Sequence, residues 1–334
     1  MAGRTVRVED VAREAGVSPI TVSRTLSAPD KVRPETRARV MEAVARTGYV
    51  VNSIASSLRS GRSSLVAVFV ASLENRHFAS VLQGALDAFE QSRFRLMFAQ
   101  AGDGAAVRPD DIEAVRPFRP AALMFTGVRL DAAARAAAGA LEVPVVEVWS
   151  DSAVVLDMAA GASIAAGAQL MGAHFAARGY ACVGYCGHTQ GPGSAGLRGF
   201  VAGYEGAGRR VGHVLPAEGL GTFRDGMAAL DAMRAALPGC DAIFFGSDML
   251  AAGALARAAE RGIAVPADLA VAGYGDLDFA AHTVPPLTSI RVSDHATGRL
   301  AGEMLRGRLE GRAPSKPVIQ VPMELIVRAS TGAV

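Results

Sequence analysis

The stretch that decides the fold is residues 8–60, VEDVAREAGVSPITVSRTLSAPDKVRPETRARVMEAVARTGYVVNSIASSLRS. Apolar residues recur at helical spacing over 8–15, and Gly16 follows where a glycine readily ends a helix in a left-handed turn. Ser18 then stands at an N-cap position, with Pro19 at the first helical position, where proline costs no hydrogen bond. The pattern predicts two short helices separated by a tight turn.

The second and third helices of this stretch carry polar faces. Ile20, Val22 and Leu26 are the apolar positions of the second helix. A third helix is expected to open at Pro34. A helix, a turn with glycine and a second capped helix make a helix-turn-helix, whose second helix enters the major groove of DNA. The side chains expected on its polar face are Thr21, Ser23 and Arg24, and those expected to reach phosphates from the third helix are Thr36, Arg37 and Arg39.

The charge of the chain is concentrated at this end. Residues 1–62 hold 11 Lys and Arg against 6 Asp and Glu, whereas the remaining 272 residues hold 23 against 26. A net charge of +5 in the first sixth of the chain and −3 in the rest is typical of a nucleic-acid-binding module joined to a neutral body. A small helical cap with a solvated basic face is the alternative.

Two interpretations fit the stretch NSIASSLRSGRSS, which begins at Asn52. In the first, Asn52 or Ser53 caps a helix of two turns with Ala55 and Leu58 on one face. Such a short helix folds only against a partner, here DNA and a second subunit, and Leu58 would wedge between base pairs in the minor groove. In the second, the stretch is a flexible linker between two domains.

The N-terminal stretch resembles the lactose/galactose repressor (LacI/GalR) family. The resemblance is carried by DVAREAGVSPITVSRTLS, then GY, an Asn three residues after the Tyr, and A-x-x-L before SGRSS. The resemblance covers the whole chain. It implies a homodimer on a near-palindromic operator in double-stranded DNA, base reading by Pro19, Ile20 and Arg24, and a minor-groove wedge at Leu58. Val51 departs from the family, which usually has proline there.

The rest of the composition excludes several classes of protein. The first 20 residues are polar, and the longest apolar run, LVAVFVASL, is too short to span a bilayer, so we expect a cytoplasmic protein without a membrane segment. The cysteines Cys182, Cys186 and Cys240 match no metal-ligand spacing and are expected to be structural thiols, although Cys182, Cys186 and His188 leave a metal site open. No cofactor and no metal is expected.

From residue 65 onward, short apolar strands alternate with helices. This alternation predicts parallel sheets covered by helices, in two doubly wound lobes that resemble periplasmic binding proteins and bind a ligand at their facing strand ends. The predicted strands are 65–70, 94–99, 121–126, 144–149, 182–186, 211–215, 241–246, 269–274, 287–292, 317–322 and 325–328. The predicted helices are 78–91, 108–118, 131–140, 162–178, 196–206, 222–236, 249–261 and 293–309.

The predicted organisation is an α/β protein with an all-α head. Residues 1–52 form the helix-turn-helix domain, 53–62 the hinge helix, and 63–334 the effector-binding and dimerisation domain. Lobe 1 is expected at about 63–160 and 290–322, and lobe 2 at 161–289 and 323–334. We expect the strand 287–292 and the helix 293–309 to return to lobe 1, and the last two strands to close the two sheets.

Catalytic motifs are weak in this sequence. Gly191, Gly193 and Gly196 spell G-x-G-x-x-G, and Glu218 follows 22 residues later, as in a dinucleotide-binding fingerprint. The glycines lie too far beyond the strand, and the proline between the first two lacks an amide that could bind a phosphate. Ser247 and Asp248 have no nearby histidine, and they are better explained as ligand contacts and a helix cap. We therefore predict that the protein is not an enzyme.

Polar and aromatic residues at the predicted strand ends are the candidate effector contacts, most of them at positions where the resemblance implies ligand contact. They are Ser72, His77, Phe78, Thr126, Trp149 and Ser150 in lobe 1, and Arg198, Ser247, Asp248, Tyr274 and Asp276 in lobe 2. Phe78 and Trp149 are equally consistent with ordinary core. An aromatic ring can pack against the apolar face of a sugar, and hydroxyl and carboxylate groups can bind its hydroxyls.

Two departures from the family concern the effector. Gly196 stands where the family usually has its sugar-binding arginine, and Gly275 where it has the aspartate that binds sugar hydroxyls. The stretches ASLENRHFASVLQGAL, VPVVEVWSDSAVVLDMAAG and AGYGDLDFAAHTVPPLTSIRV look most like the gluconate-repressor branch. A sugar acid needs a cation or a helix N-terminus for its carboxylate, and Arg198 and His77 are available.

The sequence thus predicts a transcription regulator, most simply a repressor, controlled by gluconate or a related sugar acid. One alternative is a solute-binding protein for sugar transport, which the two lobes fit but the N-terminal module does not. Another is a nucleotide-dependent enzyme on Rossmann-like lobes. Binding to duplex DNA that weakens steeply with salt separates the regulator from both.

Overall fold

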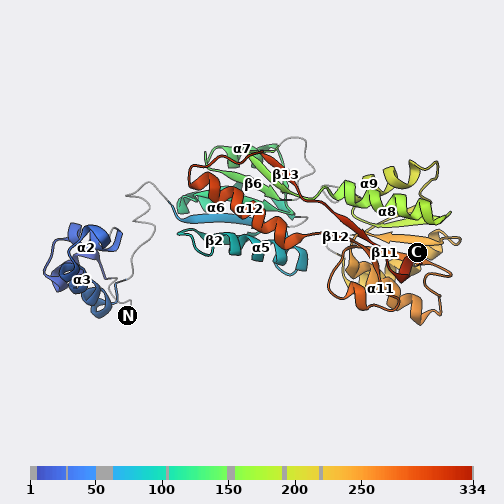
Figure 1. The fold of residues 1–334 in the computed structure, drawn as a ribbon, viewed down its shortest axis with the longest axis horizontal. Helices are drawn as coiled ribbons and strands as arrows, with labels where there is room; N and C mark the ends of the chain where they lie inside the picture. Colours follow the sequence, from blue (N-terminus) through green and yellow to red (C-terminus); the bar gives the residue numbers. More distant parts are fainter. Residues whose placement is uncertain are drawn as a thin grey trace. The chain divides into compact units, whose positions relative to one another are not determined.

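The computed structural model describes residues 6–27, 29–49, 63–102, 105–148, 155–189, 194–217 and 221–332. The chain divides into two compact units, Met1–Ser63 and Ser64–Val334 (Figure 1). The predicted hinge helix at 53–62 lies outside the described residues. Each unit is described by itself below.

The first unit is a three-helix domain. Its helices are α1 (Val8–Ala15), α2 (Pro19–Ser27) and α3 (Pro34–Thr47), with a short 3-10 turn at Pro29–Lys31. Gly16 ends α1 with a φ of 62°, in the left-handed region where a side chain would be strained. The Ser18 hydroxyl accepts a hydrogen bond from the Thr21 amide at 3.2 Å, as an N-cap does. The core of the unit consists of Val11, Ala12, Ala15, Val22, Val40 and Ala43. The predicted helix-turn-helix is confirmed.

Lobe 1 of the second unit is a parallel sheet in the order β13-β7-β6-β4-β1-β2. Its strands are β1 (Leu65–Val70), β2 (Arg95–Gln100), β4 (Ala122–Thr126), β6 (Val145–Val148), β7 (Met158–Gly161) and β13 (Val318–Gln320). Helices α5 (Arg76–Phe89) and α12 (Asp294–Leu309) cover one face, and α6 (Pro109–Val115) and α7 (Ala132–Gly139) cover the other. A short strand pair and a 3-10 turn complete the lobe: β3 (Ala106–Val107), β5 (Arg129–Leu130) and Arg116–Phe118.

Lobe 2 is a second sheet in the order β14-β12-β11-β10-β8-β9, parallel except for the antiparallel edge strand β14. Its strands are β8 (Val183–Gly187), β9 (His213–Pro216), β10 (Ala242–Phe245), β11 (Ala270–Gly275), β12 (Thr288–Arg291) and β14 (Glu324–Ile326). Helices α8 (Ile164–Arg178) and α9 (Ser194–Glu205) cover one face, and α10 (Phe223–Ala236) and α11 (Asp248–Glu260) cover the other (Figure 1). Two 3-10 turns, Ala280–His282 and Ala329–Thr331, pack beside β11 and β12.

The two doubly wound lobes are as predicted, but one strand was placed in the wrong lobe. We expected 287–292 to return to lobe 1 with the helix that follows it. The strand instead pairs in parallel with β11 of lobe 2, and only α12 returns to lobe 1. The last two strands do close one sheet each. Strand β7 was not predicted, because MAAG has none of the bulky β-branched residues that indicate a strand.

Three crossings of the described chain therefore join the lobes: β7 to α8, β12 to α12, and β13 to β14. In the first two crossings, a strand that ends in one lobe is followed within a few residues by a helix that begins in the other. This connectivity allows a hinge between the lobes and brings the carboxyl ends of their strands toward one cleft.

The C-terminal turn Ala329–Thr331 is locked into lobe 2 by a buried polar network. The Ser330 hydroxyl accepts from the Thr288 amide at 2.8 Å and donates to the Val271 carbonyl at 2.6 Å. The Thr331 hydroxyl lies 2.8 Å from that of Thr288 and 2.9 Å from Nε2 of His174. Because these groups are desolvated, each hydrogen bond left unmade would carry its full desolvation cost.

Ser330→Ala is expected to lower the free energy of unfolding by about 1–3 kcal/mol, because it leaves the Thr288 amide and the Val271 carbonyl without that partner. Urea unfolding followed by circular dichroism measures the change. Ser315→Ala is the matched control, since Ser315 is exposed, and it should change stability little. Equal stabilities of the two variants would contradict a structural role for the C-terminal turn.

Candidate functional site

The outer face of α2 presents the residues that were predicted to meet DNA. Ile20 is an exposed hydrophobic side chain, with 68% of its surface accessible, whereas Val22 on the same helix is fully buried. Ser18, Pro19 and Arg24 are exposed, and Thr21 and Ser23 are partly exposed. A large apolar side chain held in solvent beside an exposed arginine suits contact with thymine methyl groups and guanine edges.

The start of α3 adds a second set of polar groups. Arg37 is exposed in its first turn, and Thr36 is half-buried beside it. The N-terminal amides of a helix and a nearby arginine both favour an anion such as a phosphate. Asn52, Ala55 and Leu58, the predicted hinge contacts, lie outside the described residues.

In lobe 1 the candidate effector residues follow the ends of β1 and β4. The Asn75 side chain caps α5 by accepting from the His77 amide at 2.9 Å, which fixes the first turn of that helix. Phe78 is buried, and its ring fills the space beside Gly127, where a side chain could not be accommodated. Thr126, at the end of β4, is fully buried and its hydroxyl has no hydrogen-bond partner among the described residues. Ser72 is also buried, and its hydroxyl accepts from the Glu74 amide.

In lobe 2 the carboxylate of Asp248 organises three segments. Ser247 caps α11, so Asp248 is held in the first turn of that helix. Its Oδ1 accepts from the Ser289 hydroxyl of β12 at 2.6 Å, and its Oδ2 accepts from the Leu277 amide, beyond β11, at 2.7 Å. Asp248 is fully buried, and this burial raises its pKa to about 6, against the opposing effect of those hydrogen bonds.

His77 extends from lobe 1 to this part of lobe 2. Its Nδ1 lies 2.6 Å from Oδ2 of Asp294, the first residue of α12. Its ring occupies the space that a side chain on Gly275 would require. Burial alone would lower the pKa of His77, but the hydrogen bond and charge of Asp294, together with the charge of Asp248, raise it above its ordinary value. The imidazolium therefore persists to a higher pH at this position than in a free histidine side chain.

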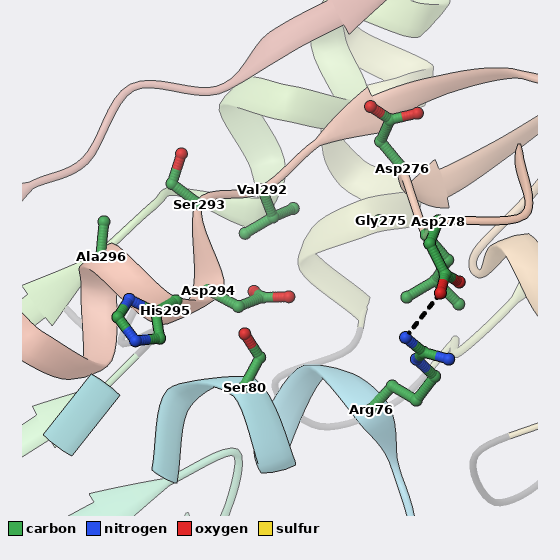
Figure 2. A pocket seen from close by; sticks show the side chains of 11 residues that line it. Arg76, Ser80, Gly275, Asp276, Asp278, Val292, Ser293, Asp294, His295 and Ala296 are labelled. Carbon is green, nitrogen blue, oxygen red and sulfur yellow. Dashed lines mark hydrogen bonds and ion pairs between the residues drawn. The ribbon is translucent and has the colours of Figure 1, made fainter. Parts of the chain in front are cut away.

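Beside His77 a cavity of about 460 Å³ opens between the lobes. Figure 2 shows Asp294 and Ser80 reaching into it from α12 and α5. Arg76 of lobe 1 donates to Asp278 of lobe 2 at 2.9 Å across its rim. Both side chains of that ion pair are largely exposed, so solvent screens it and its contribution to stability is small.

Some of the predicted effector residues are engaged within lobe 2 instead. Asp276 lines the cavity but forms ion pairs with Arg328 at 2.7 Å and Arg291 at 2.8 Å. The Tyr274 hydroxyl donates to the sulfur of Met323 at 3.3 Å, on the α8 side of the sheet. Arg198 is exposed near the start of α9 and donates to the Ser194 hydroxyl. Trp149 and Ser150, like Gly191, Gly193 and Glu218 of the glycine motif, lie outside the described residues.

Asp294 and Ser289, the partners of His77 and Asp248, were not among the predicted residues. Asp294 is an acidic residue in the first turn of a helix, and this common local feature does not indicate a functional role. It lies 217 positions from His77, so no local pattern connects them. The only signal available was the strand-to-helix crossing, which brings the residue after β12 to the cleft.

The comparisons with known proteins agree with both units. Residues 7–52 match the family described as bacterial regulatory proteins, lacI family, and residues 173–331 match a periplasmic binding protein-like domain. A Pseudomonas aeruginosa protein named HTH-type transcriptional regulator GntR is 33% identical over 97% of this chain and 95% of its own length. The chain belongs to the LacI family. Its members are DNA-binding transcriptional regulators, which confirms the regulator predicted from the sequence.

Two solved structures extend this likeness to the whole fold. A LacI-family regulator from Silicibacter pomeroyi has a TM-score of 0.89 and 27% identity, and the match covers 98% of this chain and 100% of that one. The lac repressor dimer bound to operator and an anti-inducer has a TM-score of 0.84 and 23% identity, with 99% and 100% covered. The second likeness concerns the fold alone.

Other kinds of site find no support in the described parts of this LacI-family chain. Cys186 and Cys240 are buried and Cys182 is partly buried, and no group of three metal-ligating side chains occurs among the described residues. Burial raises the pKa of the Cys186 thiol to about 12, so it is protonated and unreactive at neutral pH. No helix in the described ranges is long and apolar enough to cross a membrane.

The raised pKa of Asp248 predicts a pH-dependent stability. The folded protein holds this proton up to about pH 6, whereas an unfolded aspartate releases it near pH 4. The folded state therefore binds more protons in that window, and the contribution of Asp248 to stability falls as pH rises from about 4 to 6. Relative to Asp248→Asn, the wild-type protein should lose on the order of 2 kcal/mol over this range.

Urea unfolding of the wild-type protein and of Asp248→Asn at several pH values between 4 and 7 measures the difference. Asp110→Asn, which removes an exposed carboxylate of α6, is the control for a general loss of charge. The prediction is contradicted if the free energy of unfolding of the wild type, minus that of Asp248→Asn, rises with pH over this range.

Proposed function

We propose that this LacI-family regulator is controlled by gluconate or a closely related aldonic acid. The observation that carries the proposal is the pairing of Gly275 with His77. The family resemblance implies an aspartate at position 275 for sugar hydroxyls, but here the position has no side chain and an imidazole fills the space. An imidazole, which can carry a positive charge, thus stands where a carboxylate would repel an acid.

Arg198 supplies a second cation for the effector. It follows β8 at the start of α9, near the carboxyl end of the lobe 2 sheet. Its guanidinium donates to Ser194 and forms no ion pair among the described residues, so it keeps donors for a carboxylate. Arginine is well suited to this role, because its planar donors match the two oxygens of a carboxylate.

The remaining contacts are assigned to the polyhydroxyl chain of the effector. Thr126 carries a buried hydroxyl without a hydrogen-bond partner among the described residues. Ser72 follows the neighbouring strand β1 of lobe 1, and Ser247 follows β10 of lobe 2. Phe78 offers an apolar edge at the lobe 1 wall, as would Trp149. Resemblance to the gluconate-repressor branch and the likeness to the Pseudomonas regulator named GntR support the same class of effector.

On the DNA side we propose a homodimer on a near-palindromic operator. Its contacts would be Ser18, Pro19, Ile20, Thr21, Ser23 and Arg24 in the major groove, Thr36 and Arg37 at phosphates, and a hinge with Asn52, Ala55 and Leu58 in the minor groove. The solved lac repressor with the same fold is titled as a dimer bound to operator. The effector then acts through its different affinity for the operator-bound and free arrangements.

Titration calorimetry with gluconate tests the effector. Wild-type protein is expected to bind it, and Arg198→Ala is expected to weaken binding about tenfold or more, because a charge-assisted hydrogen bond is lost. Arg210→Ala is the matched control, an exposed arginine before β9 that should bind normally. Absence of heat with every aldonic acid tried, together with binding of a neutral sugar, would reject the proposal.

Operator binding tests the α2 face. After an operator has been selected from random DNA, Arg24→Ala is expected to weaken binding by about 1–3 kcal/mol and to relax the sequence preference at one position of each half-site. Arg37→Ala should weaken all sequences equally and lower the salt slope by about 1. Arg46→Ala, at the far end of α3 and paired with Glu14, is the control. An unchanged sequence preference in Arg24→Ala would remove that residue from base reading.

A further inference from the structure

The imidazole of His77 connects groups that belong to different lobes. In lobe 1 its Nδ1 bonds to Asp294 at 2.6 Å, and because an ionised carboxylate only accepts, Nδ1 carries the proton. In lobe 2 its Cε1 and Nε2 fill the side-chain space of Gly275. Oδ2 of Asp248 lies 3.6 Å from the position of a Cβ at Gly275, so a carboxylate of lobe 2 also faces the ring.

We propose that His77 is a positioning residue that clasps lobe 1 to lobe 2 in this arrangement of the cleft, and that Gly275 is glycine because it receives the imidazole. Asp294 and His77 both lie on lobe 1, at the starts of α12 and α5, so their hydrogen bond persists when the lobes move. Contact with Gly275 and attraction to Asp248 exist only while the lobes are together. The clasp therefore reports and stabilises one of the two lobe arrangements.

The charges around the ring give this clasp a dependence on protonation. Asp294 of α12 and Asp248 of α11 both favour the imidazolium, whereas Arg76, its neighbour on α5, opposes it. Separating the lobes removes the favourable effect of Asp248 and exposes the ring to water. Burial is the largest effect on the pKa of His77 and lowers it, so exposure to water opposes the loss of Asp248. The proton affinity of His77 therefore differs between the two arrangements, and closing the lobes exchanges a fraction of a proton with solvent.

The clasp differs from the nearby ion pair in its burial. Arg76 and Asp278 also join the lobes, but their side chains are about two-thirds exposed, whereas those of His77 and Asp294 are 18% and 10% exposed. Electrostatic contacts in a desolvated site are screened less and depend strongly on geometry. The buried contact of His77 with Gly275 and Asp248, rather than the exposed ion pair, is therefore expected to set the preference between lobe arrangements.

A double-mutant cycle separates the clasp from an ordinary requirement for glycine. The φ of Gly275 is 129°, so any side chain there is strained whether or not His77 is present. Gly275→Ala adds a Cβ that overlaps the ring, and His77→Ala removes the ring. If the clasp is real, the two effects are not additive, because the second substitution removes the clash that the first creates.

The measurement uses the full-length protein and gluconate, and it rests on the proposed function only for the choice of this probe. Gly275→Ala and His77→Ala are each expected to weaken gluconate binding about tenfold. Adding Gly275→Ala to His77→Ala should weaken binding less than adding it to the wild type does, because only the backbone strain remains. Calorimetry in buffers of different ionisation enthalpy should show a proton exchange on binding in the wild type that is lost in His77→Ala. Gly102→Ala, where a Cβ meets nothing within 4 Å, is the control.

A second readout works without any effector. Ring-nitrogen NMR of His77 should give different pKa values in the wild type and in Gly275→Ala, since displacing the ring changes both its burial and its distance from Asp248. Equal titration in both proteins, or strictly additive losses in the cycle, would overturn the clasp. If gluconate fails to bind while the NMR difference persists, the proposed effector is wrong and the clasp stands. If Gly275→Ala does not fold, Asp248→Asn carries the same NMR comparison.

Discussion

The buried carboxylate of Asp248 constrains the face that lobe 2 turns toward the cleft. A desolvated carboxylate is costly unless donors surround it, and here the donors are the Ser289 hydroxyl of β12 and the Leu277 amide beyond β11. Gly273 is required beside it, since a Cβ there would overlap Oδ1. The Asp248 carboxylate thus holds the ends of β11 and β12 together, and Gly275, at the end of β11, is positioned by the same contacts.

The central position of Asp248 explains why the candidate effector residues and the contacts between the lobes overlap. Asp248 uses both oxygens within lobe 2, so it acts on the cleft through its charge and through the backbone that it holds in place. His77 meets that charge from lobe 1, with Asp294 behind it. A change in either lobe arrangement or effector occupancy alters the electrostatic environment of the same imidazole. Coupling of this kind needs no long pathway through the protein.

The local features of this chain could be predicted because their causes are local. Gly16, Ser18 and Pro19 specify a turn and a cap within a few residues, and β1 matches its predicted bounds because LVAVFV is continuous, apolar and β-branched. The assignment of 287–292 to lobe 1 failed because a strand carries no mark of which sheet it joins. Its position depends on pairing with β11 over a long loop.

The cleft was predictable only in part for the same reason. Sequence position at strand ends identified His77 and Asp248, which do lie together, but it gave equal weight to Tyr274 and Asp276. Strand alternation turns Tyr274 to the α8 side, and Arg291 and Arg328 neutralise Asp276 from positions far along the chain. Whether a polar residue at a strand end faces a ligand or a partner within the lobe is decided by contacts that no single segment encodes.

The exchange of a side chain at 275 for an imidazole from the other lobe has a consequence for specificity. A cleft that bound a neutral sugar through a carboxylate on lobe 2 would hold that acceptor in either lobe arrangement. In this chain the imidazole of His77 takes the corresponding place, and it lies against Gly275 only while the lobes are together. An acid effector would then gain its electrostatic partner at the moment of closure, whereas a neutral sugar would gain little. Selection of an acid over a neutral sugar would then occur in the same step as the change of lobe arrangement. An effector that acts in this way binds one lobe arrangement more tightly than the other.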